Sequence, residues 1–176
     1  SAAGGFDFKI GDWEFRGTGG EDYVLRAQLG GAVIDLRLRS VAPAMRHGQA
    51  GLVDFDAAGV SYYYTRPRLE ASGTLITAEG EEFAVQVLGW LDKQWGAFQP
   101  VSVSWDWASI QLDDGRDLML TRLLGPGGEP IGGYGSMTSE GVLTALDADD
   151  FVLEAVGTDA WASAASGARY RTRWRV

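Results

Sequence analysis

The carboxylate of Asp106 is the first candidate for chemistry, because two tryptophans flank it in Trp105-Asp106-Trp107. In an extended strand Asp106 shares a face with Ala108 and Ile110, while both tryptophans point the other way. A carboxyl group on an apolar face is desolvated, which favours its neutral, proton-donating form. Indole faces stabilise a nearby cation. The alternative is an aspartate that is hydrogen-bonded to a neighbouring strand or paired with an arginine.

A second candidate is Gly89–Gly96, in which polar side chains stand between two tryptophans. Asp92 and Lys93 are candidate catalytic groups. Lys93 is alternatively an ion-pair partner of Asp92 or Asp106. Trp90, Gln94 and Trp95 are candidates for substrate contact.

A third candidate is Ser61–Glu70, which holds three consecutive tyrosines and two arginines. If the segment is extended, one face carries Tyr62, Tyr64, Arg66, Arg68 and Glu70, and the other carries Tyr63, Thr65, Pro67 and Leu69. Proline donates no backbone hydrogen bond, so Pro67 is expected to mark a sheet edge or a bulge. Tyr62, Tyr64, Arg66 and, from the segment after Trp107, Gln111 complete the candidates for substrate contact. The alternative is a surface ladder of aromatic and arginine side chains.

Several classes of site are disfavoured by the residues that are missing. The chain has no cysteine and a single histidine, His47, which excludes thiolate sites and disfavours a dedicated transition-metal site. No Gly-x-Ser-x-Gly elbow, dinucleotide fingerprint or phosphate loop occurs. Asp147, Asp149 and Asp150 form either a calcium site or, as we expect, a solvated turn. We therefore expect no metal and no cofactor.

The elements that position these residues are predicted to be β-strands. Apolar and polar residues alternate with period two in 22–29, 34–39 and, most clearly, 169–176. Asp114-Gly115 predicts a hairpin between Ser109–Asp113 and Arg116–Leu123. Further turns are expected at Gly19-Gly20, Gly30-Gly31, Glu79-Gly80, Gly127-Gly128 and Ser166-Gly167.

Many strands joined by short turns predict an all-β fold, an antiparallel lipocalin-like β-barrel that is closed so that no strand edge is left unpaired. Gly125–Gly135 is linker-like, either a long hairpin loop or a seam between two units. Little helix is expected, with short helical turns at Ala44–Gln49 and Asp147–Asp150. The 176 residues suit one lipocalin-like unit, 1–176.

Composition indicates the kind of partner. A formal charge of −9 disfavours nucleic acid and anionic membranes. Seven tryptophans suit a thick core or the wall of an apolar cavity, so a hydrophobic small molecule is the expected partner. No apolar stretch approaches the roughly 18 residues of a membrane span, so stable membrane insertion is not expected. Ser1–Gly5 lacks signal-peptide features, so both a cytoplasmic location and export after removal of a leader stay open. The sequence does not indicate the oligomeric state.

Four segments, in this order, resemble the family of carotenoid 1,2-hydratases and their AttH-like, lipocalin-like relatives. They are Tyr62–Leu69 with Ser72–Leu75, Gly89–Gly96, Trp105–Leu120 and Trp161–Trp174. The resemblance implies two lipocalin-like barrels, with 1–124 in the first and 125–176 as the linker and the start of the second. It also implies hydration of an unactivated double bond in a carotenoid or prenyl chain, or, as in fungal relatives, a cycloaddition. The family pattern commonly has histidine where this chain has Lys93.

The resulting hypothesis is a cofactor-independent, hydratase-type enzyme that adds water to, or cyclises, an isoprenoid or polyene in an apolar cavity. Asp106 would protonate the alkene, Trp95, Trp105 or Trp107 would stabilise the carbocation, and Tyr64 or Gln94 would orient the water. One alternative is a non-catalytic lipocalin-like module that binds a lipid or pigment and in which Asp106 is ion-paired. Another is a structural domain whose interior is filled.

Overall fold

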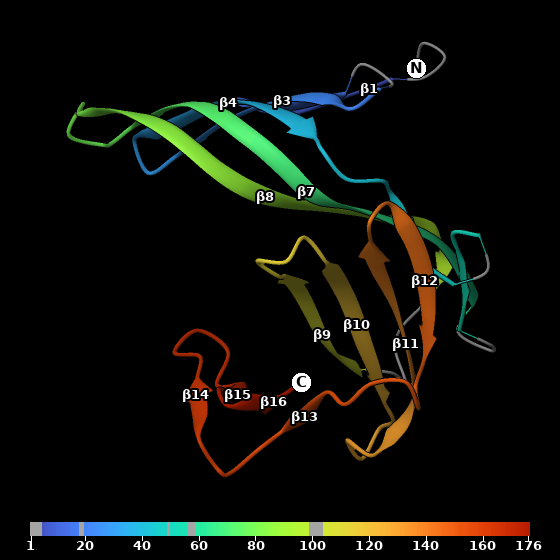
Figure 1. Cartoon of the computed structure of the whole chain (residues 1–176). Coiled ribbons are helices and arrows are strands. Elements are labelled where there is room, and N and C mark those ends of the chain that lie inside the picture. The colour runs from blue at the N-terminus through green and yellow to red at the C-terminus, as the bar shows by residue number, and fades with distance from the viewer. Residues whose placement is uncertain (1–4, 18–19, 49, 56–58, 99–103) are drawn as a thin grey trace. The chain divides into compact units, whose positions relative to one another are not determined.

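The computed structural model describes residues 5–17, 20–48, 50–55, 59–98 and 104–176, and these residues form β-strands, turns and loops without a helix. The strands are β1 (Phe6–Ile10), β2 (Trp13–Gly17), β3 (Asp22–Leu29), β4 (Ala32–Ser40), β5 (Met45–Arg46), β6 (Leu52–Asp54), β7 (Gly59–Ile76), β8 (Glu82–Phe98), β9 (Ser104–Gln111), β10 (Asp117–Leu124), β11 (Pro130–Ser139), β12 (Val142–Asp147), β13 (Glu154–Ala155), β14 (Ala160–Ala162), β15 (Arg169–Arg171) and β16 (Trp174–Arg175) (Figure 1). Strand pairing in both units is antiparallel, for example between β3 and β4 and between β10 and β11, so the all-β, antiparallel prediction is confirmed.

The chain divides into two compact units that interleave in sequence. Unit 1 comprises Ser1–Met45 and Tyr64–Lys93, and unit 2 comprises Arg46–Tyr63 and Gln94–Val176. The long strands β7 and β8 contribute to both units. The expected assignment of 1–124 and 125–176 to two barrels stays a prediction.

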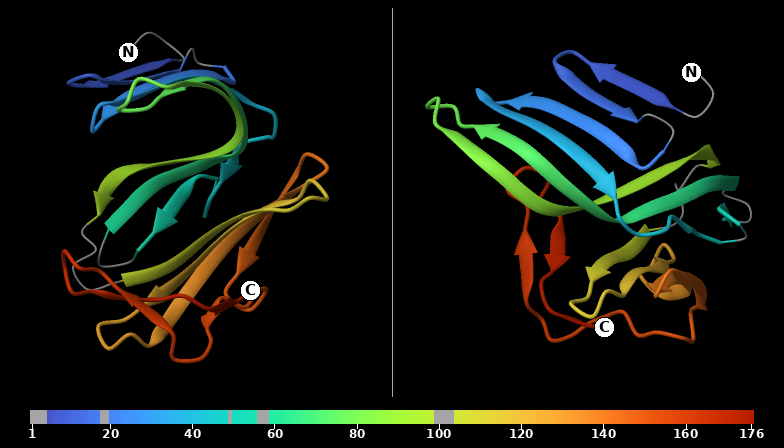
Figure 2. Two further views of the ribbon diagram at one scale, coloured as in Figure 1. Left: turned by 90° about the vertical axis from the view of Figure 1, so that its left-hand side faces the viewer. Right: turned by 45° about the horizontal axis from the view of Figure 1, so that its top comes forward.

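Unit 1 is one antiparallel sheet in which β1, β2, β3, β4 and β7 follow in order and β8 pairs with β7. The two views in Figure 2 show the blue and cyan strands β1–β4 and the adjoining green β7 and β8 as one continuous layer. Cross-strand neighbours Tyr23, Leu38 and Ala71 lie in one row of the apolar face. Arg26 and Asp35 pair at 3.4 Å on the other face. The alternation seen in 22–29 and 34–39 thus separates a dry face from a wet one.

The sheet of unit 1 is strongly curled. In a flat sheet β1 and β8 would be about 24 Å apart, five strand spacings of roughly 4.8 Å. Instead, the Nζ atom of Lys93 on β8 lies 4.6 Å from the ring centroids of both Phe6 and Phe8 on β1. The curl is that of a half-barrel. Among the described strands, β1 is hydrogen-bonded only to β2, so the sheet does not close at β1 into the complete barrel that was expected.

β7 carries a bulge around Pro67. A Cβ on Gly89 would lie 3.6 Å from Cβ of Leu69, so these two residues face each other across β7 and β8. Thr65 lies four residues before Leu69 on β7, and Asp92 lies only three residues after Gly89 on β8. The hydroxyl of Thr65 nevertheless donates to Oδ1 of Asp92. β7 therefore has one extra residue in this interval, as in a β-bulge. This placement agrees with the expectation for Pro67, and the bulge interrupts the single shared face expected for 62–70.

Unit 2 contains the sheet β12-β11-β10-β9 and the short pairs β13–β16 and β14–β15, and β6 lies against the first residues of β7. The predicted Asp114-Gly115 hairpin is confirmed by the β9–β10 register. Gly115 has φ 87°, a conformation that favours glycine. One face of this sheet buries polar side chains, namely Asp117, Thr121, Ser136 and Thr138, together with Met119.

Three expectations for local structure are wrong. Ala44–Gln49 is not helical: Met45–Arg46 is extended, Met45 is fully buried and His47 N–H donates to Tyr63 O at 3.1 Å, while Gln49 lies outside the described residues. Asp147–Asp150 is a turn, in which Asp150 N–H donates to Asp147 O at 3.0 Å. The strand expected over 169–176 is two strands, because β15 pairs with β14 and β16 with β13.

The two alternatives for Gly125–Gly135 are also resolved. Leu124 and Pro130 are paired across β10 and β11, and Gly125 N–H donates to Glu129 O at 2.8 Å. The segment is therefore a hairpin and not a seam between units. Gly132, Gly133 and Gly135 lie within β11, where a Cβ on Gly133 or Gly135 would come within 3.0 Å of the backbone of β10.

Candidate functional site

The structure distributes the predicted site residues over both units. Unit 1 holds Tyr64, Arg66, Trp90, Asp92 and Lys93, and unit 2 holds Tyr62, Gln94, Trp95, Trp105, Asp106, Trp107 and Gln111. Two carboxylates are central, one in each unit: Asp92 accepts from a hydroxyl group, and Asp106 accepts from a guanidinium group.

In unit 1 the carboxylate of Asp92 accepts a hydrogen bond from the Thr65 hydroxyl. Thr65 is fully buried and Asp92 is half-buried. A hydroxyl group both donates and accepts, so it remains a partner whether the carboxyl group is ionised or protonated. The Thr65–Asp92 pair is therefore compatible with a group that gives up and regains a proton.

The two faces of β8 carry different chemistry around Asp92. Trp90 is two residues away and therefore shares the Asp92 face of the strand, where it is half-buried. Lys93 lies on the opposite face, where its ammonium group sits over Phe6 and Phe8 in cation–π geometry. The Trp90 indole and the Asp92 carboxyl group therefore lie on the same face of β8.

The surroundings of Tyr64 favour the protonated form of its hydroxyl group. Burial raises its pKa, the neighbouring Tyr23 raises it further, and the charge of Arg66 partly opposes both. Alternation along β7 puts Tyr64 on the face opposite Thr65, the side on which Lys93 lies. Within the described residues, the buried Nε of Arg66 has no hydrogen-bond partner.

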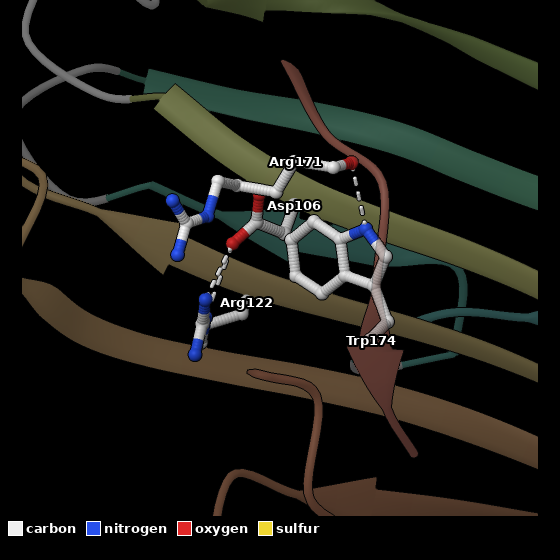
Figure 3. Close-up of polar contacts among 4 residues, drawn as sticks. All are labelled: Asp106, Arg122, Arg171 and Trp174. Atoms are coloured by element: carbon white, nitrogen blue, oxygen red, sulfur yellow. Dashed lines mark hydrogen bonds and ion pairs between the residues drawn. The ribbon is translucent and has the colours of Figure 1, made fainter. Parts of the chain in front are cut away.

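In unit 2 the carboxylate of Asp106 is paired with Arg122, as Figure 3 shows. Both Nε and Nη2 of Arg122 donate to Oδ2 of Asp106, at 3.2 and 2.7 Å. The Arg122 guanidinium lies 5.9 Å from the centroid of the Trp174 ring. Arginine only donates, so Oδ2 of Asp106 accepts both hydrogen bonds. The arginine-paired alternative is the one observed, and the catalytic role of Asp106 stays a prediction.

The tryptophans predicted to stabilise a cation have separate roles. Trp95 stacks on Tyr62 with ring centroids 5.5 Å apart. Nε1 of Trp107 donates to the hydroxyl of Tyr63 at 3.1 Å. Trp105 is 52% exposed. As expected, Trp105 and Trp107 point to the face opposite Asp106, because they pair with Leu123 and Thr121 while Asp106 pairs with Arg122. Gln94 is exposed and Gln111 is half-buried.

Sequence reasoning missed a buried polar cluster around His47. Its Nδ1 lies 2.9 Å from Oγ of Ser136, and its ring centroid lies 4.3 Å from that of Tyr63. Burial lowers the pKa of His47 from 6.5 to about 4, so the imidazole is neutral at pH 7. His47 and Ser136 are 89 residues apart, and no spacing rule in the sequence connects them.

The acidic turn shows no arrangement for a metal. The Asp150 carboxylate accepts from the Asp147 N–H at 2.8 Å, which is the bonding of a turn. Among the described residues, no group of three or more His, Asp or Glu side chains is placed to hold a metal ion. No helix in the described part of the chain is long and apolar enough to cross a membrane.

A curled antiparallel sheet with an apolar face, built from long strands and short turns, defines a lipocalin-like protein. The chain belongs to the AttH-like family, whose profile matches residues 1–176. A crystal structure described as AttH from Nitrosomonas europaea is 30% identical, with a TM-score of 0.81, and the match covers 93% of this chain and 51% of that one.

A second solved structure, kievitone hydratase from Nectria haematococca, is 16% identical with a TM-score of 0.74, which shows a shared fold. That match covers 96% of this chain and 53% of the hydratase. The chain thus spans about half the length of both similar proteins. No curated protein matches it.

Proposed function

We propose that this chain carries the acid site of a cofactor-independent hydratase-type enzyme, which adds water to a carbon–carbon double bond of an apolar isoprenoid or polyene. Asp92 is the proton donor. The observation that carries the proposal is the hydrogen bond between the Thr65 hydroxyl and the Asp92 carboxyl group. Membership of the AttH-like family and the hydratase among its structural neighbours support the reaction class.

The partner of each aspartate decides which of them serves as the acid. A general acid must be stable in both protonation states during the cycle. When Asp92 is protonated, it keeps its hydrogen bond to Thr65 by donating to the hydroxyl group. Arg122 only donates, so it offers no acceptor to a protonated Asp106. The acid role therefore moves from Asp106 to Asp92.

The step balances with these groups alone. The Asp92 carboxyl group gives its proton to one alkene carbon, and the other carbon becomes a carbocation. The Trp90 indole, on the same strand face, stabilises that charge through its π face. Water then attacks the cation and returns a proton to the Asp92 carboxylate, which restores the acid. Tyr64 and Lys93 lie on the opposite face and take no part in the step.

The test compares Asp92→Asn with the matched variant Asp106→Asn in the full chain. Each is incubated with an acyclic carotenoid, a prenylated phenol and a linear polyene in isotopically labelled water, and products are analysed for labelled hydroxyl groups. We expect labelled product from the unmodified protein and from Asp106→Asn, with turnover by Asp92→Asn reduced roughly 10²–10⁴-fold. Unchanged turnover by Asp92→Asn contradicts the proposal.

The second candidate is a non-catalytic module that binds a lipid or pigment. The Asp106–Arg122 ion pair and the apolar face of unit 1 favour it. Under this alternative the same substrates bind and are recovered unchanged, and neither asparagine variant alters their affinity by more than about twofold.

A further inference from the structure

Unit 2 contains a cleft that neither proposed function uses. Its volume is about 300 Å³, and β10, β11 and the segment 148–154 line it. This volume is at the lower end of small-molecule sites and suits a single small ring system, not a long polyene. Arg122 is the cationic side chain in the lining.

Arg122 is held in place from two sides. Asp106 accepts from Nε and Nη2, and the Trp174 ring lies beside the guanidinium plane. Nε1 of Trp174 in turn donates to Arg171 O at 3.1 Å, which fixes the indole. In Figure 3 the third nitrogen of Arg122 points away from Asp106, and the described residues offer it no hydrogen-bond partner. A positioned donor at a cleft is thus available without loss of side-chain entropy on binding.

The charges at the cleft are already balanced. Asp106 neutralises Arg122, and the lining residue Glu154 pairs with Arg175 at 2.6 Å. A free anion therefore gains little from the net charge of the cleft. The available Arg122 donor suits a neutral acceptor such as a carbonyl oxygen.

The remaining lining is apolar and flat. A Cβ on Gly133 would lie 3.5 Å from Cζ of Phe151, so the phenyl ring covers bare backbone there. Gly132 also lines the cleft, through its backbone, because its pairing with Leu123 directs a Cβ there to the opposite face of the sheet. Leu153, 6% exposed, contributes a further apolar side chain. Side-chain-free backbone beside a phenyl ring accommodates a planar molecule.

We propose that this cleft binds a small planar apolar molecule through one neutral acceptor oxygen, as in an aryl ketone, with Arg122 as the hydrogen-bond donor. The site lies apart in sequence from the Thr65–Asp92 pair and does not depend on hydratase activity. Asp106 and Trp174 are positioning residues that orient the guanidinium group.

The test titrates the full chain with acetophenone and with ethylbenzene, which has the same ring but no acceptor oxygen, and follows backbone amide NMR signals. We expect acetophenone to shift the signals of Gly132, Gly133 and Phe151 and to bind roughly tenfold more tightly than ethylbenzene. Benzoate is expected to bind no more tightly than acetophenone. Equal affinities for acetophenone and ethylbenzene, tighter binding of benzoate, or shifts confined to other residues overturn the proposal.

One variant sharpens the result. Arg122→Met should erase the tenfold preference while ethylbenzene still binds. Preserved amide signals from the strands of unit 2 away from the cleft show that the fold of this unit is intact. A preference that survives in Arg122→Met contradicts the assigned donor.

Discussion

The two units treat their polar groups differently. In unit 2 the half-buried carboxylate of Asp106 is paired with the guanidinium group of Arg122, which only donates. In unit 1 the carboxyl group of Asp92 has a hydroxyl partner that suits either state. Under the proposed function, the partner across the sheet, and not the flanking tryptophans, distinguishes the aspartate assigned to acid chemistry from the ion-paired one.

The largest effect is expected on turnover. Asp92→Asn should lower it by roughly 10²–10⁴-fold, and Asp106→Asn by less than about threefold, because only the first removes the proposed acid. A Thr65→Ser variant keeps the hydroxyl and should retain activity, whereas Thr65→Val should lose most of it. Turnover rates measured at equal protein concentration decide this. A greater loss in Asp106→Asn than in Asp92→Asn reverses the comparison between the units.

The second effect is the acid sensitivity of unit 2. Because burial lowers the pKa of His47 to about 4 from 6.5, the fold favours the neutral ring. The neutral ring therefore contributes about 3 kcal/mol to the free energy of unfolding above pH 6.5, and this contribution is lost as the pH falls toward 4. Urea unfolding at a series of pH values measures it, and His47→Gln is the control that should lack the slope between pH 6.5 and 5. A His47 ring that titrates near 6.5 by NMR contradicts the burial argument.

How far the sequence predicts these sites depends on how local their contacts are. Alternation and the Asp114-Gly115 turn predicted the β9–β10 hairpin, but a two-residue turn there pairs Asp113 with Arg116 and therefore Asp106 with Leu123, whereas the structure pairs Asp106 with Arg122. The ion pair was thus missed by one residue of register, and the apolar neighbours of Asp106 drew attention to the neutral acid instead. The bulge of β7 was indicated by Pro67 itself, since proline donates no ladder hydrogen bond.

Other contacts had no such local origin. His47 meets Ser136 across 89 residues, and Thr65 meets Asp92 across 27. Which strands become neighbours is set by packing of whole apolar faces, and period-two patterns do not encode that choice. The split of 169–176 into β15 and β16 has the same cause, because each strand pairs with a different segment, β14 or β13.

A smaller effect is expected when the ion pair is broken from its cationic side. Arg122→Met leaves the half-buried Asp106 carboxylate without its arginine and should destabilise unit 2 by about 1–2 kcal/mol. The double variant Arg122→Met with Asp106→Asn should recover part of this loss, because the uncompensated charge is gone. Urea midpoints of the three proteins measure the coupling. Additive losses would show that the pair contributes nothing beyond its separate side chains.

The smallest effect concerns Tyr64 and distinguishes the interior of unit 1 from its surface. Burial and the neighbouring Tyr23 raise the pKa of Tyr64, so its hydroxyl should ionise later than an exposed tyrosine as the pH rises through 10. The neutral phenol is the form favoured by the fold, and its contribution to stability is present below pH 10 and lost above it. An ultraviolet absorbance titration should therefore show a late-ionising tyrosine that is absent in Tyr64→Phe and retained in Tyr170→Phe, where the replaced side chain is 54% exposed. If Tyr64→Phe removes an ordinary early-ionising tyrosine instead, Tyr64 is solvated, and the dry face of unit 1 ends before this residue.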